Sequence, residues 1–232
     1  MPELRQTNFN EVPGGSPVAP NEPHLACALL LDTSGSMSGD PIESLNKAIN
    51  DFKEKTSMDE LAKKRVDVAI IEFNDTARVV QDFTPLTQLQ PVTLSATGCT
   101  AMGEGINLAI DKVKERSHLY DSLGTPRYQP WIVMITDGAP TDDISAARQR
   151  ILDEENRGSR GRLKFWALGV PGYSPEVLKS LTKRCMALTD KDFTGFFDWM
   201  SDSISIVSAS RIDENVQYTD LPDNVHRIPE DW

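Results

Sequence analysis

Three short segments of the chain hold side chains that could bind a metal ion together. Asp32, Ser34 and Ser36 follow the first apolar run, Thr100 stands just before a helical pattern, and Asp137 follows the apolar run WIVMIT. The set consists of two carboxylates and three hydroxyls. Oxygen ligands of this kind suit a hard divalent cation, Mg²⁺ or Mn²⁺, in octahedral coordination.

The spacing of the first segment favours the same chemistry. In Asp-x-Ser-x-Ser one loop presents three oxygen atoms on alternate residues, and Gly35 and Gly39 let the backbone turn tightly around an ion. Two carboxylates neutralise a divalent cation without adding an excess of negative charge. These segments contain no histidine, and Cys99 is their only cysteine. Zinc coordination by nitrogen and sulfur is therefore not expected.

The elements that position these residues alternate between β-rich runs and helical patterns. Continuous apolar or β-branched runs predict strands, and residues 74–76 between two of them predict a hairpin turn. The expected strands are Leu25–Asp32, Val66–Phe73, Ala77–Phe83, Trp131–Thr136, Leu163–Val170 and Arg184–Leu188.

Between the strands, apolar residues recur at helical spacing. Asp40 is expected to cap a helix that has Pro41 at its first position, and Ser174 to cap a shorter helix in the same way. Further helices are expected over residues 103–114, 144–151 and 193–207. The alternation predicts an α/β fold with a mostly parallel sheet, one antiparallel edge strand and helices on both faces. In such folds the ligand lies beyond the carboxyl ends of the strands.

These motifs resemble the metal-ion-dependent adhesion site of von Willebrand factor type A domains. The resemblance covers about residues 25–210 and rests on DTSGSMSGDPIES (32–44), TGCTAMGEGINLAI (97–110), ITDGAPTD (135–142) and FFDWMSDSISIVSAS (196–210). Within that family the chain is most similar to the tellurite-resistance TerY-type proteins of bacteria. The resemblance implies a Rossmann-like three-layer fold and a non-catalytic, metal-dependent protein-binding module.

The resemblance also implies a role for each residue of the site. Ser34 and Ser36 would bind the metal directly, and Thr100 directly or through water. Asp32 and Asp137 would bind directly or through water and hold the hydroxyls in place. One coordination position would stay open for an Asp or Glu carboxylate of a protein partner. Membership of the TerY-type group would place the protein in a bacterial stress-response complex with kinase-like or phosphatase-like partners.

Two other functions remain open at the level of the sequence. A Mg²⁺-dependent phosphohydrolase could use the same ion, but the chain has no G-x-x-x-x-G-K loop and no G-x-S-x-G elbow. Its motifs also contain no histidine or lysine that could act as a general base, so we do not expect an enzyme. A metal-free structural subunit of an ATPase-associated complex is the other alternative, although the intact ligand set argues against it.

Some of these residues also have purely structural interpretations. Thr100 could cap the following helix, and Asp137 could be a turn residue in Asp-Gly. Asp142 and Asp143 are expected to cap the next helix rather than to bind metal. The three histidines are scattered along the chain and are assigned no role.

The composition excludes several classes of partner. The 232 residues carry 24 Lys+Arg and 35 Asp+Glu, a net charge of −11, which argues against nucleic acid and anionic membranes as ligands. The domain is expected over residues 25–210, between a proline-rich extended arm (1–24) and an acidic extended tail (211–232). Three cysteines without disulfide or metal spacing, and the absence of an apolar signal-like segment, predict a cytoplasmic location.

Overall fold

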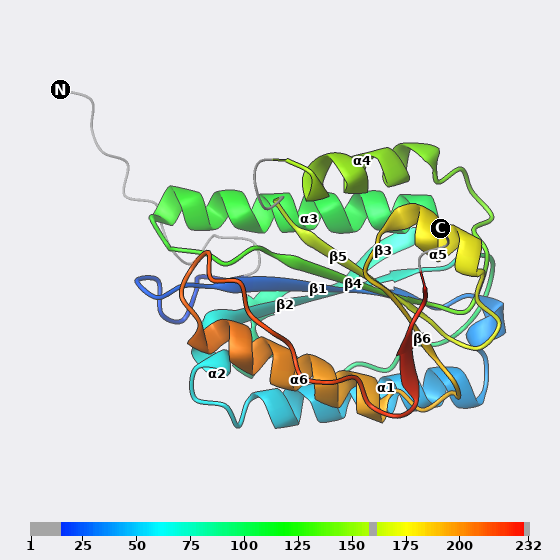
Figure 1. Ribbon diagram of the computed structural model, residues 1–232, viewed down its shortest axis with the longest axis horizontal. Helices are drawn as coiled ribbons and strands as arrows, with labels where there is room; N and C mark the ends of the chain where they lie inside the picture. Colours follow the sequence, from blue (N-terminus) through cyan, green and yellow to red (C-terminus); the bar gives the residue numbers. More distant parts are fainter. Residues whose placement is uncertain (1–14, 158–161, 230–232) are drawn as a thin grey trace.

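A seven-stranded sheet forms the centre of the protein. The computed structural model describes residues 15–157 and 162–229. The strand order is β3-β2-β1-β4-β5-β6-β7 (Figure 1). The strands are β1 (Leu25–Asp32), β2 (Val66–Phe73), β3 (Ala77–Pro85), β4 (Trp131–Thr136), β5 (Lys164–Gly169), β6 (Cys185–Leu188) and β7 (Val225–Arg227). The pairs from β2 to β6 are parallel and β3 is antiparallel to β2, which confirms the expected α/β fold and hairpin.

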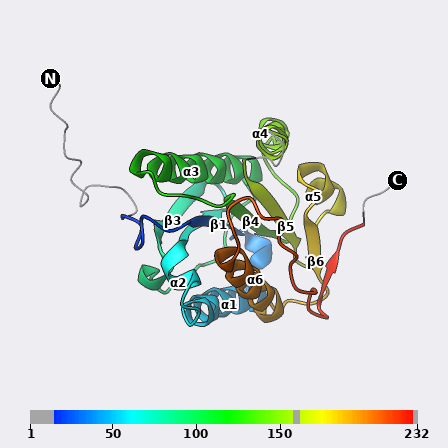
Figure 2. The ribbon, with the colours of Figure 1, turned by 60° about the vertical axis from the view of Figure 1, so that its left-hand side comes forward.

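Helices cover both faces of this sheet, as the alternation of the sequence predicts. They are α1 (Asp40–Thr56), α2 (Ala62–Arg65), α3 (Met102–Leu123), α4 (Ser145–Glu155), α5 (Pro175–Leu181) and α6 (Thr194–Ala209), with the 3-10 turns η2 (Gly35–Met37) and η3 (Leu86–Gln88). Figures 1 and 2 show α1, α2 and α6 on one face and α3, α4 and α5 on the other. In the part of the chain that the structure describes, no helix is long and apolar enough to cross a membrane.

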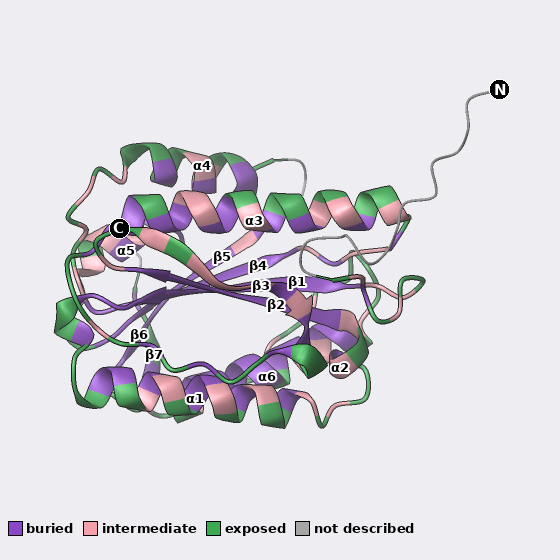
Figure 3. Cartoon of the chain, turned by 180° about the vertical axis from the view of Figure 1, so that it is seen from behind, coloured by how far each residue is buried: buried purple, intermediate pink, exposed green. Residues whose placement is uncertain are grey.

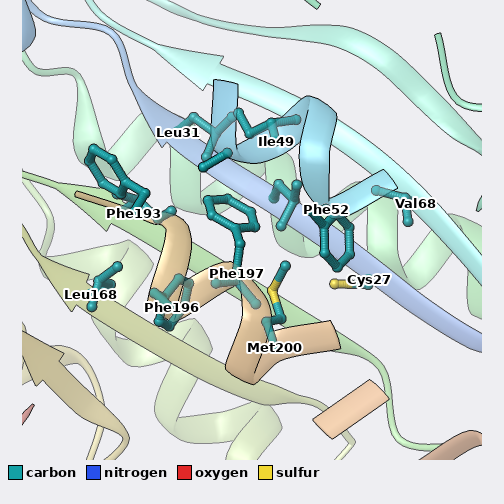
Figure 4. Packing of buried hydrophobic residues seen from close by; sticks show 14 of the residues in the cluster. Cys27, Leu31, Ile49, Phe52, Val68, Leu168, Phe193, Phe196, Phe197 and Met200 are labelled. Carbon is teal, nitrogen blue, oxygen red and sulfur yellow. The ribbon is translucent and has the colours of Figure 1, made fainter. Parts of the chain in front are cut away.

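The strand β1 is buried along its whole length because both of its faces are covered (Figure 3). Its successive side chains point to opposite faces of the sheet. Cys27 and Leu31 therefore join the apolar cluster under α1 and α6, while Leu30 joins the cluster under α3. In the first cluster, shown in Figure 4, the rings of Phe52 and Phe197 pack with centroids 5.6 Å apart. This packing fixes the end of β1, where Asp32 begins the candidate site.

The beginning of α1 differs from the sequence expectation. Gly39 is the N-cap residue, with a φ of 79°, and no side chain caps the helix. Asp40, expected to be the cap, is the first helical residue instead. There its carboxylate stabilises the positive end of the helix dipole without capping an N–H. The expectation for Ser174 is confirmed, since its hydroxyl accepts a hydrogen bond from the backbone N–H of Val177 at 3.4 Å.

Asp142 also caps a different helix from the one expected. Its carboxylate accepts hydrogen bonds from the backbone N–H groups of Gly103 and Glu104, both at 3.0 Å, at the start of α3. The loop after β4 therefore lies across the N-terminus of α3, an arrangement that depends on tertiary packing rather than on local sequence. Asp143 does serve the next helix, accepting a hydrogen bond from the backbone N–H of Ser145 at 2.9 Å.

The segment expected to be an extended tail lies against the domain over residues 211–229. The indole of Trp199 donates a hydrogen bond to the carbonyl of Thr219 at 3.0 Å. The ring of Tyr218 packs edge-on against Trp131 and Trp166. The strand β7 pairs antiparallel with β6 and adds a second antiparallel edge that was not expected. β7 is only three residues long, too short for a periodic signal; residues 230–232 lie outside the described part.

The described part of the N-terminal arm, residues 15–24, is joined to the domain at His24. This side chain is fully buried, and its backbone N–H donates to the carbonyl of Pro126 at 2.9 Å. Its Nδ1 atom lies 3.3 Å from the carboxylate of Asp67 in β2. Residues 1–14 of the expected arm lie outside the described part.

Candidate metal centre

Asp32 ends β1 as a fully buried carboxylate at the carboxyl edge of the sheet. One carboxylate oxygen, Oδ1, accepts a hydrogen bond from the backbone N–H of Ser34 at 2.8 Å. The other, Oδ2, accepts one from the hydroxyl of Thr136 in β4 at 2.5 Å. Burial raises the pKa of Asp32, the charge of Asp137 adds to the rise, and the hydrogen bonds from Ser34 and Thr136 oppose it. Within the described residues, the hydrogen bonds to this carboxylate therefore come from neutral donors.

Ser34, Ser36 and Asp137 form a short chain of oxygen atoms beside Asp32. The hydroxyl oxygens of Ser34 and Ser36 are 3.1 Å apart, and Ser36 donates a hydrogen bond to Oδ1 of Asp137 at 2.7 Å. The turn η2 brings the two serines together between β1 and α1. Because the proton of Ser36 points to Asp137, the lone pairs of the Ser36 hydroxyl are left for another ligand. Asp137 is 8% exposed, whereas Ser36 is exposed to solvent.

Thr100 completes the group from a third loop. A Cβ atom placed on Gly138 would lie 3.4 Å from the hydroxyl of Thr100 and 3.8 Å from Oδ2 of Asp32. The two side chains therefore converge on the glycine that follows Asp137. The N-cap residue of α3, Ala101, gives no side-chain cap, and the N–H groups of Gly103 and Glu104 donate to Asp142, so the Thr100 hydroxyl is not used as the helix cap. The structure brings all five predicted site residues to one edge of the sheet.

The hairpin turn between β2 and β3 binds the backbone of the two residues that flank Thr100. Asp75 accepts a hydrogen bond from the backbone N–H of Cys99 at 2.8 Å, and the carbonyl of Asn74 accepts one from Ala101 at 2.7 Å. These two N–H groups flank Thr100 in the chain. The side chain of Asn74 also donates to the hydroxyl of Thr33 at 3.2 Å. Sequence reasoning missed Asn74 and Asp75, which it read only as turn residues.

The loop after β4 holds Thr100 from the other side. Thr141 accepts a hydrogen bond from the backbone N–H of Thr100 at 3.1 Å and donates its own N–H to the carbonyl of Thr100 at 2.9 Å. The first loop is tied in as well, because the N–H of Gly35 donates to the carbonyl of Gly98 at 3.0 Å. The three loops therefore form one hydrogen-bonded unit.

The oxygen atoms of this unit fit a small, hard cation. Mg²⁺ with ligands at about 2.1 Å in an octahedron has neighbouring ligand oxygens about 3 Å apart, close to the 2.7 Å and 3.1 Å separations around Ser36. Among the described residues, neither Asp32 nor Asp137 forms an ion pair. The candidate centre combines two carboxylates with three hydroxyls, and no group of three or more His, Cys, Asp or Glu side chains that could hold a metal lies elsewhere in the described part. Two carboxylates buried together without a counter-charge favour a bound cation.

Cys99 does not change this donor set. The thiol is exposed, and its hydrogen bond to the Asp75 carboxylate, together with that negative charge, raises its pKa. The thiol therefore stays protonated at neutral pH and is a poor metal ligand.

Comparisons with known proteins identify the fold that carries this site. The profile of the von Willebrand factor type A domain family matches residues 27–199. The chain belongs to this family. The matched von Willebrand factor type A segment includes all of the residues of the candidate centre. No curated protein matches the chain.

Several solved structures share the fold at low sequence identity. A von Willebrand factor type A protein from Catenulispora acidiphila is 16% identical, with a TM-score of 0.59, covering 79% of this chain and 43% of the other. The pilus adhesin SpaC from Lactobacillus rhamnosus GG is 13% identical (TM-score 0.64; 81% and 30% covered). The domain of the pilus tip protein Mfa5 from Porphyromonas gingivalis is 12% identical (TM-score 0.59; 84% and 99% covered). The chain thus spans less than half the length of the first two.

Proposed function

We propose that this von Willebrand factor type A domain is a non-catalytic protein-binding module that depends on Mg²⁺ or Mn²⁺. Ser34, Ser36 and Thr100 would supply neutral oxygen ligands, and Asp32 and Asp137 would bind the ion directly or through water. The observation that carries the proposal is the linked hydroxyl–carboxylate chain, in which buried acids lack a counter-charge among the described residues.

The exposure of the ligands indicates how a partner would bind. The two acids are buried, whereas Ser36 is exposed. The ion would therefore meet solvent on its hydroxyl side, where neutral ligands leave much of its positive charge uncompensated. A carboxylate from an Asp or Glu of a partner protein supplies the missing charge and completes the coordination. The bound cation contributes a site for this acid and provides no reaction.

The contacts of the site argue against the enzymatic alternative. The side chains that contact the five candidate ligands are neutral hydroxyls such as Thr136 and Thr141. A phosphohydrolase requires a group that accepts a proton from the attacking water, and no histidine or lysine contacts the ligands within the described residues. The pilus neighbours named above are an adhesin and a pilus tip protein. The metal-free alternative leaves Asp32 and Asp137 buried without compensation.

The test is a calorimetric titration of the metal-free chain with MgCl₂ and with MnCl₂. We expect one saturable site that is lost in Ser36→Ala. Ser38→Ala is the matched control, because Ser38 lies on the same loop, is exposed and makes only a backbone hydrogen bond to Gly35. Absence of saturable binding by the unmodified chain, or equal loss in the two variants, would contradict the proposal.

The biological setting is proposed from the resemblance to TerY-type proteins. We infer a role in a bacterial stress-response complex linked to tellurite resistance, with kinase-like or phosphatase-like partners and a cytoplasmic location. The absence of a disulfide among the described residues is consistent with a reducing compartment. In a strain that lacks this chain, we expect the unmodified protein to restore growth on tellurite and Ser36→Ala to fail. Equal growth with both proteins, or no effect of the deletion, would refute this role.

A further inference from the structure

A second candidate site lies at the opposite edge of the sheet from the metal centre. A cleft of about 630 Å³ opens at the amino ends of β4 and β5, beside the C-terminal end of α6. Its lining includes Trp131 and Lys164, the first residues of β4 and β5, and Arg184, which directly precedes β6. Residues 211–216 of the C-terminal segment close one side. The cleft shares no residue with the candidate metal centre.

The lining of this cleft reverses the charge balance of the chain. The whole sequence has 24 Lys+Arg against 35 Asp+Glu. The acids that line the cleft are Asp213 and Glu214, and the basic residues are Arg127, Arg162, Lys164, Arg184 and Arg211. Positive charge is therefore gathered at one place on a protein that is negative overall, and such a field attracts anions locally.

Two of the guanidinium groups in the cleft are already neutralised. Arg127 donates to the carboxylate of Asp121 at 2.8 Å, and Arg184 to that of Glu155 at 2.6 Å. The ammonium of Lys164 donates to the hydroxyl of Tyr218 at 2.7 Å.

The other two guanidinium groups are exposed and have no partner among the described residues. For Arg162 and Arg211, no hydrogen bond or ion pair of the side chain involves any described residue. The nearby Glu214 does not neutralise Arg211, because its carboxylate accepts the backbone N–H of Arg211 at 2.8 Å and closes a local turn. The cleft thus presents two guanidinium groups that no described residue neutralises.

We propose that this cleft binds a phosphate-bearing anion. Guanidinium groups present two parallel N–H donors that match the oxygens of phosphate, and several of them around one cavity suit a group with more than one negative charge. The volume of about 630 Å³ is large enough for a chain of phosphates or for a phosphorylated side chain with its neighbours. Free oligophosphate and a phosphoserine peptide share this chemistry.

The experiment is a calorimetric titration of the full chain with sodium tripolyphosphate, and separately with a short phosphoserine peptide. EDTA is present throughout, so that binding at the metal centre does not contribute. We expect saturable binding with one site, which weakens by about tenfold in Arg162→Ala and in Arg211→Ala, because each loses a charge-assisted hydrogen bond. Both side chains are exposed, and equal melting temperatures check that the variants fold.

The matched control is Lys47→Ala, which removes the same charge from an exposed position on α1, outside the cleft. We expect it to leave the affinity unchanged. Tighter binding of the peptide identifies a phosphorylated protein as the source of the anion, and tighter binding of tripolyphosphate identifies a free phosphate. The proposal is overturned if neither probe binds saturably at about 50 mM salt, or if Lys47→Ala weakens binding as much as the cleft variants do.

Discussion

Replacing Asp67 should reveal how the protein tolerates a buried charge far from the metal centre. Asp67 is the second residue of β2, pairs with Ala26 in the register of β1 and β2, and is 1% exposed. Its Oδ2 lies 2.9 Å from the guanidinium of Arg116 and 3.3 Å from Nδ1 of His24, and it accepts a short hydrogen bond from the hydroxyl of Tyr120. This cluster ties the arm residue His24 and the helix α3 to the sheet.

The expected magnitude follows from the burial of Arg116, which is 2% exposed. Asp67→Asn keeps the shape of the side chain but leaves the guanidinium buried without its counter-charge. Removing one partner of a buried ion pair costs about 3–5 kcal/mol. That is a large fraction of the roughly 5–15 kcal/mol by which domains are stable. Replacing both members, in Asp67→Asn with Arg116→Met, should recover most of the loss, because no unpaired charge remains.

The assay is urea unfolding of the single and double variants. Asp51→Asn is the control, since that carboxylate pairs with Lys47 on the exposed surface of α1, and we expect no measurable change. The reasoning is refuted if Asp67→Asn loses less than about 1 kcal/mol, or if Arg116→Met recovers nothing in the double variant.

The same carboxylate should give the protein a distinct acid sensitivity. Burial raises the pKa of Asp67, but the His24 hydrogen bond and the charge of Arg116 outweigh it, so the pKa lies below its ordinary value. A carboxyl with a lowered folded-state pKa stabilises the fold fully above its unfolded pKa of about 3.9, and this contribution is lost as the pH falls through the folded value. Below about pH 4 the unmodified chain should therefore lose stability more steeply than Asp67→Asn. Parallel pH profiles would contradict this assignment.

Substitutions at three further positions test the support of the metal centre. Asp75→Ala should weaken Mg²⁺ binding about fivefold by releasing the loop of Thr100. Asp75→Asn should not weaken it, because the side chain keeps the oxygen that accepts the hydrogen bond. Equal losses of affinity by calorimetry would mean that the charge of Asp75, and not its hydrogen bond, supports the binding. Gly98→Ala should lower the melting temperature by at least about 2 °C, since Gly98 has a φ of 75° and an added Cβ would lie 2.5 Å from the Asp75 carboxyl; an unchanged melt would contradict this. Thr136→Val should cost about 1–3 kcal/mol in urea unfolding by removing the donor to Asp32; Thr84→Val on β3 is the comparison.

The fold was predictable from the sequence where burial is continuous. The boundaries of β1, β2 and β4 agree with the apolar runs because helices cover both faces of these strands. α3 runs past the expected end, to Leu123, where Gly124 with a φ of 68° follows as the C-cap. The expected end at residue 114 was wrong because the later turns alternate exposed polar and buried residues. Neither β7 nor the cap supplied by Asp142 has a local signal, since both depend on contacts between distant segments.

The sequence also predicted the side chains of the candidate site, but not the residues that support its loops. Asp32, Ser34, Ser36, Thr100 and Asp137 lie together, because each follows or precedes an element whose position the hydrophobic pattern determines. Whether they bind a metal stays a prediction. The residues that hold the loops could not be predicted in the same way, because the hairpin register brings Asn74 and Asp75 beside the loop of Thr100.

The chain buries acids in two different ways, and the difference bears on the metal proposal. Asp67 is surrounded by groups that carry or can take up positive charge, Arg116 and His24. Asp32 and Asp137 are surrounded by hydroxyl and amide donors only, within the residues described. Neutral donors reduce the cost of burying a carboxylate but do not cancel its charge. An arginine beside Asp32 and Asp137 would cancel their charge, as Arg116 does beside Asp67. Its absence among the described residues, together with the exposed Ser36, supports the proposal that a cation binds there.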